Sequence, residues 1–242
     1  MRLPIPCMHC SFEDMPRTSI FDSTVNLEIN DNGKYITTCK NGHTSLTFLQ
    51  QQKFEILFEI GAYAIIDGYY REAVSSFTAA LERFYEFFVK TVCISKGNEY
   101  DEILNTWKKI SNQSERQLGA YIFTYFIEFR KKPDTLSDKD SQFRNAVIHK
   151  GKIPTREESI KYGQTILDLI RPVLSQVKSR YTDFCEEDYM KNIMNRSSSE
   201  KELKITTMSI PTILSLTIVE PAHSERSLDS ILEELRHHRV PS

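Results

Sequence analysis

The spacing of apolar residues changes near residue 50, where alternation gives way to helical spacing. Apolar side chains alternate over residues 25–29, the turn sequence Asn-Asp-Asn-Gly follows, and β-branched or aromatic residues dominate 34–38. Strands of this kind on either side of an Asn-Gly turn predict a β-hairpin. Residues 45–49, which include two Leu and one Phe, offer a candidate third strand.

Beyond residue 50 the apolar residues recur every three or four positions, which is typical of amphipathic helices. Four segments carry this spacing clearly: 54–65, 73–88, 118–129 and 160–177. Gly68 separates the first two, so we expect two long helices joined by a tight turn. A weaker helical pattern covers residues 99–110.

Two capping-box patterns predict where further helices begin. The sequence Ser-Asp-Lys-Asp starts at Ser137, and Thr-Arg-Glu-Glu starts at Thr155. In such a box the first side chain and the fourth residue satisfy each other's free backbone N–H groups. The helix that follows Ser137 should stop at Gly151, and the helix that follows Thr155 should bend at Pro172.

These patterns predict a mainly α protein in which a helical bundle follows a small β unit. We expect three parts: residues 1–49, a helical domain over 50–180, and a C-terminal extension over 181–242. In the extension, apolar residues alternate over 214–218 and an amphipathic pattern covers 228–235, which indicates a short strand and a short helix. The pattern leaves open whether the extension is ordered alone or with a partner.

Composition narrows the class of protein. The 242 residues are 40% hydrophobic and 26% charged, which excludes collagen-like, wholly disordered and all-membrane chains. No apolar run approaches the roughly 20 residues of a bilayer span, and the N-terminal sequence lacks the apolar stretch of a signal peptide. We therefore expect a cytoplasmic protein without a membrane partner. The net charge of −2 means that only a local patch can bind nucleic acid.

Cysteine and histidine residues in the first part have the spacing of metal ligands. Cys7 and Cys10 form one pair, and Cys39 and His43 flank an Asn-Gly turn that forms the other. A tetrahedral Zn²⁺ takes four such thiolate or imidazole ligands. The pattern resembles a zinc ribbon, in which the closed shell makes the metal structural. His9 is an alternative to His43, and free thiols with a surface His are the alternative to a metal site.

The second candidate site is a basic stretch in the helical part. From Arg144 to Arg156 the chain has four basic residues, one His and no acidic residue. Arginine presents a planar set of donors that fits phosphate oxygens, and histidine can move a proton near neutral pH. The stretch therefore suits a phosphodiester. The alternative is a solvated helix end at which His149 is favoured by the helix dipole.

Arg144, Asn145 and His149 together resemble the motif of the HEPN superfamily (higher eukaryotes and prokaryotes nucleotide-binding). Nuclease members carry an Arg and a His separated by four to six positions, and the first of these positions, directly after the Arg, is a polar residue, often Asn. The resemblance covers about residues 51–180. It implies a helical bundle, a homodimer with one composite cleft, and metal-independent cleavage of RNA by attack of the ribose 2′-hydroxyl. Arg144 would stabilise charge on phosphorus, His149 would move a proton, and Asn145 would orient the His or the phosphate.

Helix geometry adds a constraint on this motif. Five residues rotate by about 500°, so Arg144 and His149 lie roughly 140° apart around the axis. Asn145 and His149 are four residues apart and share a face. One helix is therefore expected to present Asn145 with His149, and two such helices paired across a homodimer would complete the site.

The sequence thus predicts an endoribonuclease in which the zinc ribbon docks a partner or helps to select RNA. The resemblance further implies that the protein is a prokaryotic toxin or phage-defence effector, with an antitoxin or another protein as its partner. Glu82 lies just off the apolar stripe of its helix and is a further candidate for the site or for an ordinary salt bridge. The main alternative is a non-catalytic zinc-ribbon and helical dimer that binds a protein or nucleotide. A third is a nucleotide-binding helper of a nucleotidyltransferase.

Overall fold

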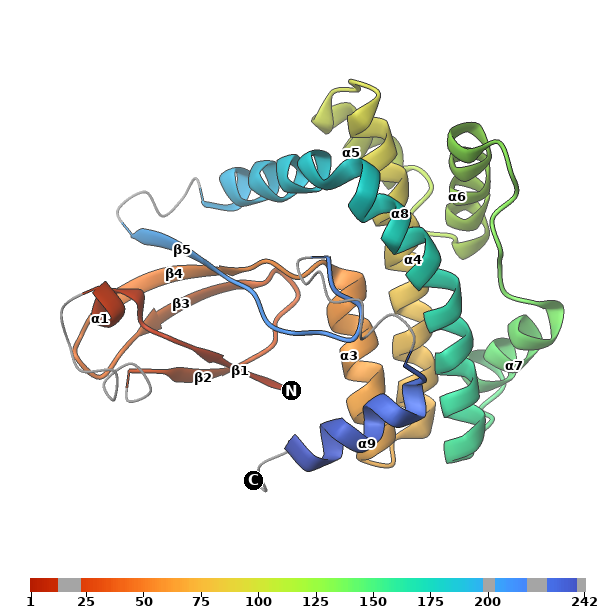
Figure 1. The fold of residues 1–242 in the computed structure, drawn as a ribbon, viewed down its shortest axis with the longest axis horizontal. Coiled ribbons are helices and arrows are strands. Elements are labelled where there is room, and N and C mark those ends of the chain that lie inside the picture. Colours follow the sequence, from red (N-terminus) through yellow and green to blue (C-terminus); the bar gives the residue numbers. More distant parts are fainter. Residues whose placement is uncertain (13–22, 198–202, 217–225, 239–242) are drawn as a thin grey trace. The chain divides into compact units, whose positions relative to one another are not determined.

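The structure is a computed structural model that describes residues 1–12, 23–197, 203–216 and 226–238. It divides into two compact units (Figure 1). The first unit comprises Met1–Gln51 and Tyr189–Ile210, and the second comprises Gln52–Asp188 and Pro211–Ser242. The C-terminal extension is therefore shared between the units and does not form a part of its own. Positions 217 and 218 of its predicted strand lie outside the described residues.

The first unit contains two small sheets and a short helix. Its elements are β1 (Arg2–Ile5), α1 (Met8–Phe12), β2 (Val25–Glu28), β3 (Lys34–Thr38), β4 (Thr44–Leu49) and β5 (Lys204–Met208). Strands β1 and β2 pair in an antiparallel sheet, and β4 lies between antiparallel β3 and parallel β5. As the central strand, β4 is buried over most of its length, and its Leu46 and Phe48 pack against Ile193.

The predicted hairpin between residues 25–29 and 34–38 is wrong. Both segments form strands, but β2 pairs with β1 and β3 pairs with β4, with Thr38 opposite Thr44. The turn that closes β3 onto β4 is the one at Gly42, which has φ +81° and a backbone hydrogen bond to Cys39. The N-terminal strand supplies buried Leu3 and Ile5 to pair with β2, and the sequence analysis missed this strand.

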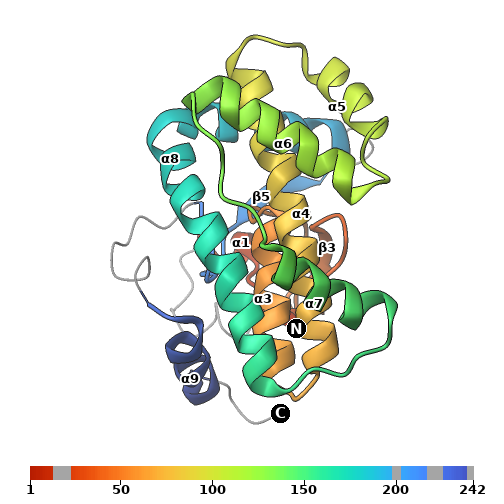
Figure 2. The ribbon, with the colours of Figure 1, turned by 90° about the vertical axis from the view of Figure 1, so that its right-hand side faces the viewer.

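The second unit is helical, and the prediction of a mainly α protein with a small N-terminal β region is confirmed. Its helices are α3 (Lys53–Ile66), α4 (Tyr70–Ser95), α5 (Tyr100–Lys108), α6 (Ser114–Phe129), α7 (Asp138–His149), α8 (Arg156–Ser197) and α9 (Leu228–His238), of which α8 continues into the first unit. Figure 2 shows α6 and α7 packed on the side of α4 that faces the viewer. These two helices therefore form one wall of the second unit.

Local hydrogen bonds explain where α7 and α8 begin and end. The backbone N–H of Thr155 donates to Glu158, and the N–H of Glu158 donates to the Thr155 hydroxyl, so the predicted capping box is complete. The Ser137 hydroxyl accepts from the backbone N–H of Asp140 at the start of α7. This helix ends before Gly151, which adopts the left-handed φ of +72° that favours glycine.

Helix α8 is interrupted at Tyr181, nine residues after Pro172, where a bend was expected from the sequence. Tyr181 has the non-helical angles φ −131° and ψ 18°, and its hydroxyl donates a hydrogen bond to Glu128 of α6. Around Pro172, Ile170 and Leu174 are both buried in the core. Packing on both sides of the proline therefore holds this part of the helix in place.

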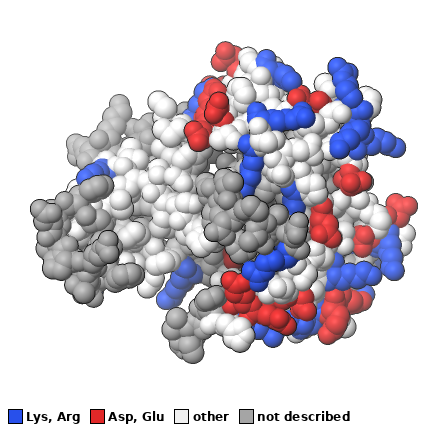
Figure 3. Space-filling view, in the orientation of Figure 1, with Lys and Arg blue, Asp and Glu red and all other residues white. Residues whose placement is uncertain are grey.

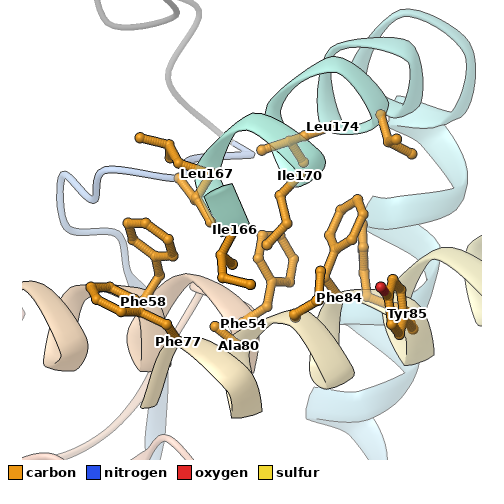
Figure 4. Packing of buried hydrophobic residues seen from close by; sticks show 14 of the residues in the cluster. Phe54, Phe58, Phe77, Ala80, Phe84, Tyr85, Ile166, Leu167, Ile170 and Leu174 are labelled. Carbon is orange, nitrogen blue, oxygen red and sulfur yellow. The ribbon is translucent and has the colours of Figure 1, made fainter. Parts of the chain in front are cut away.

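Helices α3, α4 and α8 meet in an aromatic and aliphatic core (Figure 4). The ring of Phe77 in α4 packs on Phe58 of α3, with ring centroids 4.8 Å apart. A Cβ atom at Gly61 of α3 or at Gly163 of α8 would lie 2.6 Å from this ring. Only glycine fits at these two positions without movement of the ring, and both neighbouring helices approach α4 closely as a result.

Two buried carboxyl groups of α3 hold the chain that follows Ile210. Glu55 accepts from the backbone N–H of Leu216, and Glu59 accepts from the N–H of Ile213, each at 3.1 Å. Glu55 is 1% exposed and Glu59 is 4% exposed. Burial raises the pKa of each to about 7, although these hydrogen bonds and the charge of Lys178 near Glu55 act in the opposite direction. Both carboxyl groups therefore bind a proton more tightly in the folded chain.

We expect this burial to make the protein less stable at high pH. A folded-state pKa above that of the unfolded chain gives stability that is fully present below about pH 4.5 and is lost as the pH rises to about 7. Each group should account for at most about 3 kcal/mol. Urea unfolding followed by circular dichroism at pH 5 and pH 8 measures the loss. The Glu55→Gln/Glu59→Gln double variant should lose much less than the wild type, whereas the exposed control Glu72→Gln should behave as the wild type. Equal losses in the wild type and the double variant would contradict the expectation.

Candidate functional sites

Four predicted metal ligands come together in the first unit. One potential ligand atom each from Cys7, Cys10, Cys39 and His43 lies within 4.8 Å of the other three. The Sγ atoms of Cys10 and Cys39 are 3.8 Å apart, and His43 Nδ1 lies 3.3 Å from Cys10 Sγ and 3.9 Å from Cys7 Sγ. Metal–sulfur bonds of about 2.3 Å in a tetrahedron place sulfurs about 3.8 Å apart, and a nitrogen about 3.6 Å from a sulfur. The cluster therefore fits a bound tetrahedral metal ion.

The turn between β3 and β4 prepares this cluster. Cys39 donates its backbone N–H to the carbonyl of His43 at 3.0 Å, which brings the two ligands to the same side. Burial alone would raise the pKa of the Cys39 thiol, but hydrogen bonds with the backbone of His43 and Asn41 and with the thiols of Cys7 and Cys10 lower it to about 7. The deprotonated thiol is the form that binds metal.

His9 is not part of the cluster, so the structure favours His43 over this alternative. The His9 ring stacks on the ring of His43, with centroids 5.2 Å apart and an interplanar angle of 26°. The side-chain amide of Asn41 donates to Cys10 Sγ at 3.3 Å. His9 and Asn41 therefore act as supports that fix the orientation of ligands.

The cluster predicts one bound metal ion per chain, which elemental analysis of the purified protein can measure. Cys10→Ser should lose most of this metal, because a hydroxyl is a much weaker ligand than a thiolate and Cys10 lies at the centre of the sulfur contacts. Cys93→Ser is the matched control, since Cys93 lies in α4 and outside the cluster. A wild-type protein without metal, or a Cys10→Ser protein with a full complement, would refute the prediction.

The second unit contains a cleft of about 440 Å³ between α4, the start of α6 and the end of α7. Its lining is mostly polar and comprises Ser75, Thr78, Ala79, Glu82, Arg83, Ser111, Asn112, Ser114, Gln117, Arg144, Ile148 and His149. Three of these residues are candidates from the sequence: Glu82, Arg144 and His149. Together with Arg83, the fold therefore places one carboxyl, two guanidinium groups and one imidazole around the same space.

Asn145 does not line the cleft and is exposed on α7. The helix presents Arg144 and Ile148 on one face, because they are four residues apart, and His149 reaches the cleft as the last residue of the helix. Asn145 lies one turn before His149 on α7 but is not among the residues that line the cleft. Arg144 and His149 border one cleft within a single chain.

The charge of Arg144 is not neutralised by an ion pair with any residue that the structure describes. Its Nε is buried and has no hydrogen-bond partner among those residues. Burial raises the pKa of Glu82, while the positive charges of Arg144 and Arg83 oppose this effect. Glu82 and Arg144 therefore interact electrostatically in the cleft, and Arg144 remains available to an anion.

Arg83 is held in place by the opposite wall of the cleft. Its guanidinium donates to Glu86 at 2.6 Å and to the Gln117 side chain at 2.8 Å, and Gln117 donates to the Ser111 carbonyl at 2.7 Å. Ser114 begins α6, so free N–H groups and the positive end of the helix dipole lie at this wall. The sequence analysis did not identify these residues, although the polar run Ser-Asn-Gln-Ser before an amphipathic helix is a recognisable helix-start signal.

Comparisons with models of protein families, with curated proteins and with solved structures find no match for this chain. Within the described residues, no helix is both long and apolar enough to span a membrane. On the face drawn in Figure 3, positive and negative side chains are intermixed over the second unit. A function for the chain therefore has to be argued from the metal cluster and the cleft.

Proposed function

We propose that the chain is a metal-independent endoribonuclease of the HEPN type whose active site is the cleft of the second unit. The observation that carries the proposal is the presence of Arg144, His149 and Glu82 around one cleft. An unpaired guanidinium in a cleft that also holds the positive N-terminal end of α6 attracts an anion, and an imidazole in the same cleft can move a proton at neutral pH.

The proposed reaction is an internal transesterification, in which the 2′-oxygen of RNA replaces the 5′-oxygen on the phosphorus. His149 either removes the proton of the ribose 2′-hydroxyl or protonates the leaving 5′-oxygen, and Arg144 stabilises the charge that develops on the phosphate. The 2′-oxygen forms a bond to phosphorus and the bond to the 5′-oxygen breaks. The products are a 2′,3′-cyclic phosphate and a 5′-hydroxyl, and no water or metal is consumed. Glu82, whose pKa is raised by burial, is a candidate for the second proton transfer.

The metal of the first unit is proposed to be a structural Zn²⁺. Three thiolates and one imidazole form a donor set that suits zinc and closes its tetrahedral shell. Cys7, Cys10, Cys39 and His43 would hold the ion, which would stabilise the small β unit in its folded form. The unit itself would dock a protein partner or help to select RNA.

The biological setting follows from the resemblance to nuclease members of the superfamily. We infer a cytoplasmic toxin or phage-defence effector that works as a homodimer and is controlled by an antitoxin or another protein. A second candidate function is a non-catalytic module that binds protein or nucleotide. The exposed position of Asn145 and the intermixed charges favour this alternative.

Removal of the His149 or the Arg144 side chain should almost abolish RNA cleavage. His149→Ala and Arg144→Ala should each reduce the rate by about 10²–10⁴-fold, and Arg144→Lys should stay impaired because an ammonium loses the planar set of donors. Lys139→Ala is the matched control, since Lys139 is an exposed cation of the same helix outside the cleft. Cleavage of single-stranded RNA is measured with EDTA added at the start of the reaction, and the ends are identified by mass spectrometry.

DNA should remain intact in the same assay, because it has no 2′-hydroxyl. A wild-type protein that binds RNA but does not cut it would favour the non-catalytic module. Cleavage that persists undiminished in His149→Ala would show that the cleft is not the active site.

The geometry gives Asn145 a smaller role than the sequence motif does. Because its side chain is exposed outside the cleft, Asn145→Ala should change the cleavage rate by no more than about threefold, compared with 10²-fold or more for a catalytic group. The same RNA assay checks this. A loss as large as that of His149→Ala would mean that Asn145 reaches the substrate, as it would in a composite dimer site.

A further inference from the structure

The outer side of α6 exposes an apolar face. Phe123 is 69% exposed, Phe126 is 48% exposed and Ile127 is 61% exposed. Phe126 and Ile127 lie three and four residues after Phe123, so their side chains are its neighbours on the helix surface. At Gly119, one turn before Phe123, a Cβ atom would have no described atom within 4 Å. Single exposed apolar residues are common on protein surfaces, whereas contiguous exposed apolar residues are typical of binding surfaces.

Positive charges flank both ends of this face. Arg116 lies at its start, and Arg130, Lys131 and Lys132 follow its end, and all four are exposed. Glu115 is an exposed acidic residue nearby, whereas Glu128 is paired with Lys96 at 2.7 Å. The face therefore combines exposed rings with an excess of positive charge, which suits an anionic ligand.

This charge pattern argues against a second copy of the chain as the occupant. Arg116 lies in the first turn of α6 and Arg130 follows its last residue, so the two cations mark opposite ends of the face. If two α6 faces paired in antiparallel orientation around Phe123, each Arg116 would lie opposite an Arg130. In parallel pairing each arginine would face its own copy. Both arrangements bring like charges together, which is unfavourable at an interface.

We propose that the α6 face binds single-stranded RNA, with bases stacked on Phe123 and Phe126 and phosphates held by the flanking cations. The inference rests on the proposed RNA substrate and names its class as unpaired RNA. Rings three residues apart on a helix have Cβ atoms about 5–6 Å apart, so they can contact neighbouring bases. Aromatic platforms with adjacent cations bind single strands because every base has a face that can stack.

The position of the face relates it to the cleft. Helix α6 begins at the wall of the cleft with Ser114 and Gln117, and the exposed rings of Phe123 and Phe126 lie about two to three turns further along the same helix. The rings lie about 120–180° around the helix from Ser114 and Gln117, so a strand that leaves the cleft would pass around α6 to reach them. The face would hold nucleotides some distance along the strand from the scissile phosphate and favour substrates whose bases are unpaired.

The test measures binding of a fluorescent single-stranded RNA of twelve nucleotides by fluorescence anisotropy. Its riboses are 2′-O-methylated, so the strand cannot be cut and binding is measured separately from cleavage. Phe123→Leu and Phe126→Leu keep apolar bulk but lose the ring, and each should weaken binding by about tenfold. Phe123→Trp keeps an aromatic ring at this position and should bind the strand at least as tightly as the wild type. Tyr69→Ala is the matched control, because Tyr69 is 63% exposed at the start of α4.

Neutralisation of Arg130, Lys131 and Lys132 by Gln should reduce the dependence of binding on salt. A duplex of the same sequence should bind more weakly than the single strand. Wild-type affinity in both Leu variants would overturn the proposal. So would a wild-type dimer in light scattering that becomes a monomer in Phe123→Ala, because the face would then be a protein interface. If RNA binding depends on the rings of Phe123 and Phe126 but unmodified RNA is not cleaved, the result would support the α6 face and refute the proposed nuclease. Failure of the α6 proposal can therefore be distinguished from failure of the proposed function.

Discussion

The helical unit depends on the fit of one aromatic ring between two glycines. The Phe77 ring occupies the space that a Cβ atom would take at Gly61 and at Gly163, so α3 and α8 both approach α4 at the same level. Leu228 of α9 also packs over Gly163. One turn of α4 therefore determines the spacing of three other helices. Close packing of this kind fixes the rotation of α4, because a small turn of the helix would drive the ring into a backbone.

The orientation of α4 then positions the chemistry of the cleft. Thr78, next to Phe77, is hydrogen bonded to the buried hydroxyl of Tyr162 at 2.9 Å, and Glu82 follows one turn later at the cleft. The metal cluster is built differently, because its ligands come in two pairs that are each close in sequence, Cys7 with Cys10 and Cys39 with His43, and a bound ion would hold the two pairs together. The cleft depends on long-range helix packing, whereas the metal centre depends on local turns and coordination.

This contrast explains what the sequence could predict. The starts of α7 and α8, the capping box at Thr155 and the metal ligands follow from local spacing, and the structure places them as expected. The partner of β2 was mispredicted because the turn after it is compatible with a hairpin, and only tertiary pairing shows that β1 competes for the same strand. The exposure of Asn145 and the polar wall around Ser111 depend on how α6 and α7 pack on α4, which periodicity does not encode.

The most direct test of the account is whether a phosphodiester binds at His149. The chain has six histidines, so the imidazole signals of isotope-labelled protein can be assigned by NMR with single substitutions. Titration with an RNA dinucleotide that carries a 2′-fluoro group at the scissile position occupies the site without reaction. The account predicts a saturable shift of the His149 signal that disappears in Arg144→Ala, while the His43 signal stays unchanged. A His149 signal that does not move when RNA binds would contradict it.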